Sequence, residues 1–338
     1  MVSVGIIGAS GYTGAELLRL GAAHPDFDIV YATGDTQAGS AVASLYPSLA
    51  AGYPELVFET FDRDRAAGLD LVFLGLPHEA SLRMVAELRG DVGCIVDLSA
   101  AFRLKDPGLY PRWYGFEHDF PDLLAEAVYG LPELYRDELK GAALVATPGC
   151  YVTAASLAIT PLVRSGLIEP SGVIVDAASG VSGAGRALKH TSLFCTADED
   201  FTAYALLDHR HTPEIEQVSG AQVLFTPHLA PMSRGILATC YARPAATVTT
   251  ESLIASLRGF YDGEPFVVVG QASPSTKATL GSNAAHLTAR FDERTGYVMV
   301  LCAIDNIAKG ASGGAVQAAN VALGLPEAAG LSAIGMYP

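Results

Sequence analysis

The cysteine at position 150 stands where the sequence predicts a reactive thiol. Cys150 follows the tight turn Pro148-Gly149 and opens a mostly apolar segment, residues 151–163, that is typical of a helix. The unpaired backbone N–H groups and the positive dipole end of a helix start favour an anion. Such an environment lowers the pKa of a thiol and stabilises the nucleophilic thiolate. Free cysteines are otherwise most often buried, so the turn and the helix are what favour chemistry here.

A second chemical signature lies near the start of the chain. Glycines at positions 8, 11 and 14 follow a short apolar run, residues 2–7, and precede a helix predicted over residues 15–23. Strand, glycine-rich turn and helix open a nucleotide-binding sheet, in which N–H groups at the helix start face a pyrophosphate. Glycine turns without ligands are common, but the position after the first strand favours a cofactor site. The residues expected to bind the cofactor are Gly8, Ser10, Gly11, Tyr12, Thr13 and Gly14.

A thiolate and a hydride-carrying dinucleotide in one protein indicate redox chemistry at an acyl carbon. Such chemistry requires a proton shuttle, and histidine suits neutral pH. His209 and His211 flank Arg210, and this tripeptide is the kind of positive cluster that an anionic substrate requires. A lone histidine is more often an ordinary polar residue, so the tripeptide by itself leaves both interpretations open.

Other segments offer candidate contacts to an anionic substrate. Residues 179–186 (SGVSGAGR) combine small residues with one arginine, and Ser182, Gly183 and Arg186 are expected to line a pocket for an anionic substrate. A flexible turn is the plainer interpretation of this segment. Arg103 and Arg234 are further candidates, because a guanidinium group pairs well with a carboxylate. Surface salt bridges explain these two arginines equally well.

The composition limits the classes of protein that fit. The chain has 338 residues, 50% of them hydrophobic, and a net charge of −15, so two domains with well-formed cores are expected. The negative charge argues against nucleic-acid and membrane-surface partners, whose phosphates would repel the protein. Five widely spaced cysteines without a CxxC pair indicate a reducing compartment and no metal site. An apolar strand follows Met1 directly without a basic leader, so a cytoplasmic protein is expected.

The elements that must position these residues fall into two groups. Before Cys150, apolar strands alternate with helices, which implies a parallel, doubly wound sheet of the Rossmann type. After it, strands follow one another with few helices between the later ones, which indicates an α+β domain with a largely antiparallel sheet. The expected fold class is therefore α/β. A dinucleotide-binding domain is expected over residues 1–149 with 305–338, and a catalytic, oligomerisation domain over residues 150–304.

Several sequence blocks resemble the N-acetyl-γ-glutamyl-phosphate reductases, arginine-pathway enzymes related to the aspartate-semialdehyde dehydrogenases. Residues 145–161 (VATPGCYVTAASLAITP) are similar to the active-site segment of that family. The likeness covers essentially the whole chain, and the blocks together are highly specific. The other matching blocks include GASGYTGAELLRL from Gly8, LGLPHEAS from Leu74, DLSAAFRLKDP from Asp97, HRHTPEIEQ from His209 and AIDNIAKGASGGAVQ from Ala303.

The resemblance implies the reductive dephosphorylation of a small acyl phosphate, N-acetyl-γ-glutamyl phosphate. Cys150 would attack the γ-carbonyl carbon and expel phosphate, and a hydride from a reduced nicotinamide would convert the resulting thioester to the semialdehyde. His209 matches the base of the family, with His211 as the runner-up. Pro77 and Asn306 resemble family positions around the nicotinamide, although a loop proline and a helix cap are their plainer interpretations.

The dinucleotide that the family implies is NADP. Residues 33–37 carry Asp35 and no arginine or lysine, which suits a ribose hydroxyl better than a 2′-phosphate, so NAD is not excluded. Three residues depart from the family pattern. Thr147 stands where asparagine is usual, Val152 replaces a common proline, and Ala101 replaces an aspartate that would help to position the arginine after it. None removes the expected nucleophile or base, so an active enzyme is expected.

Other functions compete with this interpretation. A sister reductase acts on an aminoadipyl phosphate attached to an acidic carrier protein, but docking such a carrier favours a basic surface and this chain is acidic. An aspartate-semialdehyde dehydrogenase is less favoured, because its cysteine segment differs from Pro-Gly-Cys-Tyr. A non-catalytic nicotinamide sensor would keep the dinucleotide domain while Cys150 or His209 became dispensable. The family also implies a homodimer or a homotetramer.

Overall fold

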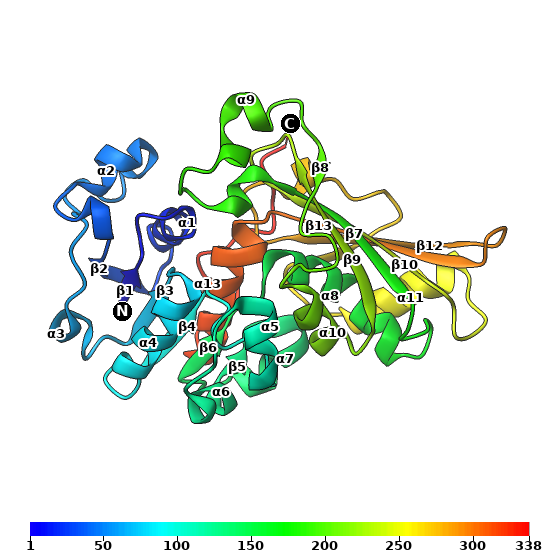
Figure 1. The fold of residues 1–338 in the computed structure, drawn as a ribbon, viewed down its shortest axis with the longest axis horizontal. Coiled ribbons are helices and arrows are strands. Elements are labelled where there is room, and N and C mark those ends of the chain that lie inside the picture. The colour runs from blue at the N-terminus through cyan, green and yellow to red at the C-terminus, as the bar shows by residue number, and fades with distance from the viewer. Residues whose placement is uncertain (338) are drawn as a thin grey trace. The chain divides into compact units, whose positions relative to one another are not determined.

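The computed structural model describes residues 1–337, which form two compact units (Figure 1). The first unit comprises Met1–Pro148 and Ala311–Leu331, and the second comprises Gly149–Gly310 with the residues from Ser332 onward. The sequence pattern predicts a single return to the first unit at residue 305, whereas the chain returns at residue 311 and leaves again at residue 332. The hydrogen bonds explain this difference. The Asp305 carboxylate accepts the Gly281 N–H at 2.7 Å, and the Asn283 N–H donates to the Ser332 carbonyl at 2.7 Å.

The first unit contains a six-stranded sheet in which every pair is parallel. Its spatial order is β2-β1-β3-β4-β6-β5, so the chain places its second and third strands on opposite sides of the first. Ligands of open parallel sheets bind at such a reversal, outside the carboxyl ends of the strands. The strands are β1 (Val2–Ile7), β2 (Phe27–Ala32), β3 (Leu71–Leu74), β4 (Cys94–Asp97), β5 (Val128–Tyr129) and β6 (Leu144–Ala146).

Helices cover both faces of this sheet. Ile6 and Phe73 belong to a buried cluster with residues of α1 and α13, whereas their neighbours Ile7 and Leu74 belong to a second cluster with residues of α4. Successive strand residues point to opposite faces, so the alternation defines a doubly wound sheet. The helices are α1 (Tyr12–Gly21), α2 (Val42–Leu45), α3 (Arg63–Ala66), α4 (His78–Leu88), α5 (Tyr110–Tyr114), α6 (Pro121–Glu126), α7 (Pro132–Leu139) and α13 (Gly313–Ala322). Short 3₁₀ turns are η1 (Asp35–Gln37), η2 (Pro47–Leu49) and η3 (Pro107–Leu109).

The second unit contains a seven-stranded mixed sheet in the order β11-β12-β13-β10-β7-β9-β8. The β7/β9 and β11/β12 pairs are parallel and the other four pairs are antiparallel, so the sheet is largely antiparallel. The strands are β7 (Val173–Gly180), β8 (Thr202–Ala203), β9 (Val223–Ala230), β10 (Ile236–Ala242), β11 (Val267–Val269), β12 (Ala285–Asp292) and β13 (Tyr297–Ile304).

One long helix, α8 (Cys150–Arg164), packs against β10 and β13 in the second unit. Alternate residues of β10, from Ile236 to Ala242, are buried, while Leu237 and Tyr241 stay partly exposed. The remaining helices of the unit are α9 (Phe194–Ala197), α10 (Thr212–Ser219), α11 (Thr250–Phe260) and α12 (Thr276–Thr279). Its shorter helical turns are η4 (Val181–Ala184), η5 (His190–Ser192) and the π-helical η6 (Ala308–Ser312). Within residues 1–337, none of the helices has the length and apolar character needed to cross a lipid bilayer.

Candidate active site

The glycine-rich turn of the first unit is shaped by close backbone approach. Gly8 has φ +88°, and a Cβ there would lie 2.5 Å from the carbonyl oxygen of Gly75. A Cβ on Gly14 would lie 2.4 Å from the Cα of Ala9. Only glycine tolerates both the positive φ and such contacts. The turn therefore packs directly against the end of β3.

Hydrogen bonds fix the same turn. The Gly8 N–H donates to the Thr33 hydroxyl at 3.0 Å, and the Ala9 N–H donates to the Thr33 carbonyl at 2.7 Å. The Tyr46 hydroxyl donates to the Ser10 carbonyl at 2.7 Å. The turn is thus anchored to the end of β2, and its geometry exists before any ligand binds.

The start of α1 is suited to a dinucleotide. Gly11 is the N-cap residue, and as a glycine it provides no side-chain cap for the helix. The nearest atom to a Cβ on Gly11 would be the Gly8 oxygen, 3.6 Å away, so the missing side chain leaves space at this point. First-turn N–H groups of Tyr12, Thr13 and Gly14 are therefore available to phosphate oxygens. The residues present fit a nicotinamide dinucleotide.

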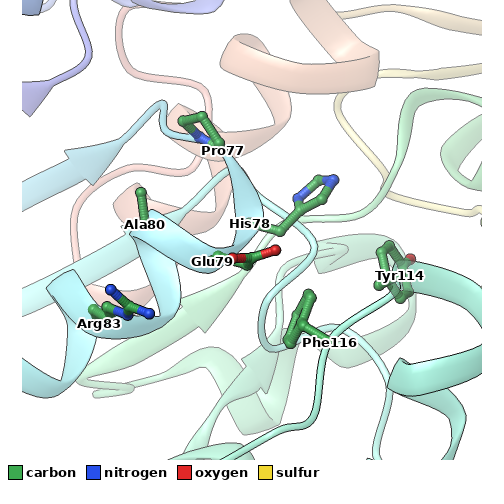
Figure 2. A pocket seen from close by; sticks show the side chains of 7 residues that line it. All are labelled: Pro77, His78, Glu79, Ala80, Arg83, Tyr114 and Phe116. Atoms are coloured by element: carbon green, nitrogen blue, oxygen red, sulfur yellow. The ribbon is translucent and has the colours of Figure 1, made fainter.

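A cavity of about 500 Å³ lies at the carboxyl end of β3 in the first unit. Figure 2 shows His78, Tyr114 and Phe116 beside it, with Arg83 further along α4 than His78. The His78 Nδ1 accepts the Ala100 N–H at 3.0 Å, and its ring meets the Tyr114 ring edge-on at 5.5 Å between centroids. Pro77, predicted near the nicotinamide, is the N-cap residue of α4 and lines this cavity.

Cys150 is the first residue of α8 in the second unit. The N-cap residue is Gly149, with φ −66° and ψ 146°, and as a glycine it provides no side-chain cap for the helix. The Gly149 N–H donates to Oε1 of Glu214 at 2.9 Å. A Cβ on Gly310 would lie 2.9 Å from the Cβ of Cys150, so that glycine lets η6 pass close to the cysteine.

The partly exposed Cys150 opens into a cavity of about 320 Å³. Cations, hydroxyl groups and both predicted histidines share its walls. Lys189 and Arg210 place positive charge at this cavity although the chain as a whole is acidic. An anionic ligand requires such a local positive site. The lining residues are Cys150, Tyr151, Ser179, Gly180, Gly183, Ala184, Lys189, Thr191, Thr202, Tyr204, His209, Arg210, His211 and Leu229.

The other cysteines differ from Cys150 in exposure. Cys94, Cys240 and Cys302 are buried, and Cys195 is exposed in α9. Burial raises the pKa of Cys94 and of Cys240 to about 12. These two thiols are therefore protonated and unreactive at neutral pH.

The geometry of His209 restricts what its ring can do. Its Nδ1 accepts the backbone N–H of His211 at 3.1 Å, so the neutral ring carries its proton on Nε2. Burial, with a smaller contribution from the Arg210 charge, lowers the pKa of His209 to about 4. Near neutral pH this ring is an uncharged hydrogen-bond donor.

Two tyrosines form a hydrogen-bonded chain beside Cys150. The Tyr204 hydroxyl donates to the Tyr151 hydroxyl at 3.2 Å, and Tyr151 donates to the His228 carbonyl at 2.9 Å. Burial raises the pKa of Tyr204 to about 12 and also raises the pKa of Tyr151. Both hydroxyl groups therefore stay protonated around neutral pH and can donate.

The small residues of 179–186 divide between the cavity and its support. Gly183 lines the cavity. Ser182 instead accepts a hydrogen bond from Nδ2 of Asn306 at 3.0 Å, while Oδ1 of Asn306 accepts the Gly235 N–H at 2.7 Å. Asn306, expected near the nicotinamide, therefore holds this loop within the second unit. Arg186 is exposed and is not among the cavity-lining residues.

The two other predicted arginines contact the protein itself. Arg103 is buried in the first unit and donates to the Thr147 carbonyl at 2.6 Å and the Leu98 carbonyl at 2.9 Å. Arg234 pairs with the buried carboxylate of Asp305 at 3.0 Å. Neither lines the cavity around Cys150. Their expected substrate contacts therefore stay predictions.

Several residues of the site were not predicted from the sequence, and four of them show why. Lys189, Tyr204 and Thr202 line the cavity, and Glu214 holds the turn before the cysteine. Glu214 lies in the HRHTPEIEQ block, where an acidic residue directly after Pro213 was the available signal of a first helical turn. Lys189, Thr202 and Tyr204 lie in a segment of short turns without a regular hydrophobic pattern. The sequence therefore does not indicate which of its side chains face a cavity.

Two family models match the chain. The NAD binding domain of semialdehyde dehydrogenase matches residues 3–142, and the semialdehyde dehydrogenase dimerisation domain matches residues 150–306. Solved structures agree in fold. Aspartate semialdehyde dehydrogenase II from Vibrio cholerae has a TM-score of 0.71 at 16% identity, covering 96% of this chain and 98% of that one. The enzyme from Candida albicans, solved with NADP, has a TM-score of 0.70 at 14% identity, covering 95% and 98%. The predicted α/β fold class is confirmed.

Curated relatives are much more similar in sequence. The N-acetyl-gamma-glutamyl-phosphate reductase of Symbiobacterium thermophilum is 47% identical over 347 residues, covering 100% of this chain and 99% of that protein. The reductase of Citrifermentans bemidjiense is 45% identical over 348 residues and both chains are covered fully. That of Jannaschia sp. is 47% identical over 346 residues, with 99% of each chain covered.

Proposed function

This chain belongs to the N-acetyl-γ-glutamyl-phosphate reductase family, and from that premise we propose that Cys150 is the nucleophile of the family's reaction. The family predicted from the sequence blocks is confirmed. The chain is an oxidoreductase of arginine biosynthesis that reduces N-acetyl-γ-glutamyl phosphate to N-acetylglutamate 5-semialdehyde. One observation carries the assignment of the nucleophile: Cys150, at a helix start, shares one cavity with Lys189 and Arg210.

The first chemical step needs only residues of this cavity. The Cys150 thiolate adds to the γ-carbonyl carbon, a C–S bond forms, and the C–O bond to phosphate breaks with its electron pair leaving on the phosphate. Lys189 and Arg210 supply positive charge for the phosphate and the α-carboxylate of the substrate. The first-turn N–H groups of α8 stabilise the negative charge that develops beside the cysteine.

The cofactor is a nicotinamide dinucleotide, and NADP is consistent with the family. The turn from Gly8 to Gly14 would hold its pyrophosphate through the first-turn N–H groups of α1. When bound in reduced form, the nicotinamide supplies the hydride that reduces the acyl group. Asp35 lies in η1, in the loop after β2. A carboxylate at this place suits a ribose hydroxyl, so the enzyme assay compares NADP with NAD directly.

We assign His209 a narrower role than the general base expected from the sequence. Its neutral ring would donate from Nε2 to the substrate oxygen as that oxygen gains negative charge. With His209 as a donor, His211 is the residue that would accept the thiol proton of Cys150, because Nε2 of His211 lies at the turn before Cys150. A Cβ on Gly149 would be 2.3 Å from that nitrogen.

The experiment follows nicotinamide absorbance with N-acetylglutamate semialdehyde, phosphate and either NADP or NAD. We expect phosphate-dependent reduction of the dinucleotide, lost by a factor on the order of 10⁴ or more in Cys150→Ala. Cys195→Ala removes an exposed cysteine outside the cavity and is the matched control, with turnover unchanged. Near-normal turnover of Cys150→Ala would overturn the thioester mechanism and favour a non-catalytic role for the cysteine.

The assembly and location of the protein are also proposals. We infer a homodimer or homotetramer formed through the sheet of the second unit, supported by partly exposed Leu237, Tyr241 and Met299 and by the family model over residues 150–306. Sedimentation of the intact chain against Tyr241→Glu tests this, and a monomeric wild type contradicts it. A cytoplasmic location is supported by five cysteines outside any disulfide. Cell fractionation is its test.

A further inference from the structure

A buried carboxylate contacts the turn from which the nucleophile projects. Glu214 is fully buried in the first turn of α10, and its Oε1 accepts the backbone N–H of Gly149 at 2.9 Å. Gly149 is itself buried and is the N-cap residue of α8, so Cys150 is the next residue along the chain. The contact joins residues that are 65 positions apart in the sequence.

The physical reason for an acid at this position lies in the two helix starts. A buried N–H group such as that of Gly149 requires an acceptor. A carboxylate in the first turn of α10 also interacts favourably with the positive dipole end of its own helix. Glu214 thus meets donors or partial positive charge from two helices, α10 and α8, which offsets the cost of burying it.

A second residue of the same segment restrains the turn from another side. The ring of His211, the N-cap residue of α10, lies against the Cα of Gly149. A Cβ there would come within 2.3 to 2.7 Å of three of its ring atoms. Residues at the start of α10 therefore contact Gly149 at two points, the Gly149 N–H group and the Gly149 Cα. Few orientations of the backbone at Gly149, the residue before Cys150, satisfy both contacts.

We propose that Glu214 is a positioning residue for Cys150. By accepting the Gly149 N–H, it sets the direction in which the Cys150 side chain and the first-turn N–H groups of α8 face the cavity. This proposal rests on the proposed function, in which Cys150 is the nucleophile. Glu214 is not among the cavity-lining residues and makes no contact with substrate in this role.

The role predicts a split between kinetic constants. The cations expected to bind substrate, Lys189 and Arg210, lie on other segments of the cavity wall. Loss of the Glu214 acceptor would misplace the nucleophile and leave these cations in place. Because misplacement by about 1 Å can cost about a hundredfold in rate, kcat should fall much more than KM changes.

The experiment compares two uncharged substitutions of similar size. Glu214→Gln keeps an amide oxygen that can accept the Gly149 N–H, whereas Glu214→Leu does not. Glu216→Leu is the matched control, because the Glu216 carboxylate on the same helix accepts a different N–H group, that of Val223 at 3.1 Å. Readouts are kcat and KM, together with the rate at which iodoacetamide alkylates Cys150 in the cofactor-free protein, followed by mass spectrometry.

We expect Glu214→Gln and Glu216→Leu to stay within about threefold of the wild type in kcat and in alkylation rate. Glu214→Leu should lose about a hundredfold in kcat and about tenfold in alkylation rate, with KM within about threefold. Equal loss in the Gln and Leu variants would overturn the proposal, because the acceptor oxygen would then not be what matters. Unchanged alkylation and kcat in Glu214→Leu would overturn it as well.

Glu214→Asn covers the case in which the leucine variant does not fold. Its amide is one methylene shorter and cannot reach the Gly149 N–H at the present separation, so it should reproduce the leucine phenotype. Full activity of Glu214→Asn would overturn the proposal. Failure here is distinguishable from failure of the proposed function. An active Cys150→Ala removes the nucleophile itself, whereas an unaffected Glu214 variant leaves Cys150 as nucleophile and rejects only this contact.

Discussion

Two helix starts in this molecule are adapted to anions, and they are held in place by different means. At the glycine-rich turn before α1, the chain is fixed by close backbone contacts, such as that between Gly8 and Gly75, and by Thr33 at the end of the neighbouring strand. At the turn before α8, the restraint comes from side chains of α10, namely Glu214 and His211. The first turn is shaped mainly by close backbone contacts that only glycine allows, with hydrogen bonds to Thr33 and Tyr46 in addition. The second turn also needs glycine at position 149, but its restraint comes from two side chains of one distant segment.

This difference explains why the first turn can be recognised from the sequence and the restraint on the second cannot. Steric demands on neighbouring residues produce a compact glycine pattern, because Gly8 and Gly14 are each required by a close backbone contact. Restraint by side chains leaves no such local pattern, since the residues involved are distant in the sequence. If the two turns are independent, a substitution in one should leave the chemistry of the other unchanged.

The largest effect on kcat is expected from a substitution in the turn before α8, which precedes Cys150. In Gly149→Ala the new Cβ would lie 2.3 Å from Nε2 of His211, so the ring or the turn must move. We expect kcat to fall by at least about a hundredfold, as misplacement of a nucleophile by about 1 Å does. The dissociation constant for NADP, measured by fluorescence titration, should not change. Gly259→Ala in α11, where a Cβ meets nothing within 4 Å, is the control. A Gly149→Ala enzyme within threefold of normal kcat would contradict the steric argument.

Substitutions of His209 distinguish a role as hydrogen-bond donor from a role as general base. Gln can place an N–H group near the position of Nε2 but cannot take up a proton at neutral pH, whereas Ala does neither. We expect His209→Ala to lose about a hundredfold in kcat and His209→Gln to stay within about tenfold of the wild type. Steady-state assays at pH 7.5 give both values. Equal losses would favour the general base expected from the sequence and count against the donor role.

A smaller effect is expected at the glycine turn. Gly8→Ala places a side chain at φ +88°, which costs about 1–2 kcal/mol, and pushes against the Gly75 carbonyl. NADP affinity should fall by about tenfold, which corresponds to about 1.4 kcal/mol. The alkylation rate of Cys150 without cofactor should be unchanged. A changed alkylation rate would show that the two turns are coupled.

The smallest effect concerns acid stability. An unfolded histidine binds a proton near pH 6.5, whereas the folded His209 binds one only near pH 4, so the unfolded state holds more protons between these values. The free energy of unfolding therefore falls as the pH falls through this window. Between pH 7.5 and 5.5, we expect it to fall by about 1 kcal/mol more in the wild type than in His209→Gln. Urea denaturation at both pH values measures this, and parallel behaviour of the two proteins would reject the low pKa.

Much of the fold could be predicted from local patterns. Residues 2–7, predicted as the first strand, form β1 with those bounds, and the apolar residues 297–304 form β13. Their runs of apolar residues, bounded by turns, are strong signals for buried strands. The return of the chain to the first unit was less predictable. It depends on how the Asp305 carboxylate binds N–H groups after β13, which no periodicity reports.

Site residues could be predicted where a chemically reactive side chain stands next to a recognisable turn. Cys150 and the histidines stand in recognisable segments, and the structure brings them to one cavity. Arginines are harder to place, because a guanidinium group serves a buried carbonyl or carboxylate as well as a ligand. Arg103 and Arg234 illustrate this, since their partners, Thr147 and Asp305, lie far from them in the sequence.

The uneven exposure of the five cysteines has a consequence for the durability of the enzyme. Peroxide damage follows thiolate character and access to solvent. Cys94 and Cys240 are protected on both counts, which concentrates oxidative attack on Cys150 and on Cys195. The sulfur that makes turnover possible is therefore also among the first that an oxidant would reach, so under peroxide stress the loss of function should precede any loss of fold.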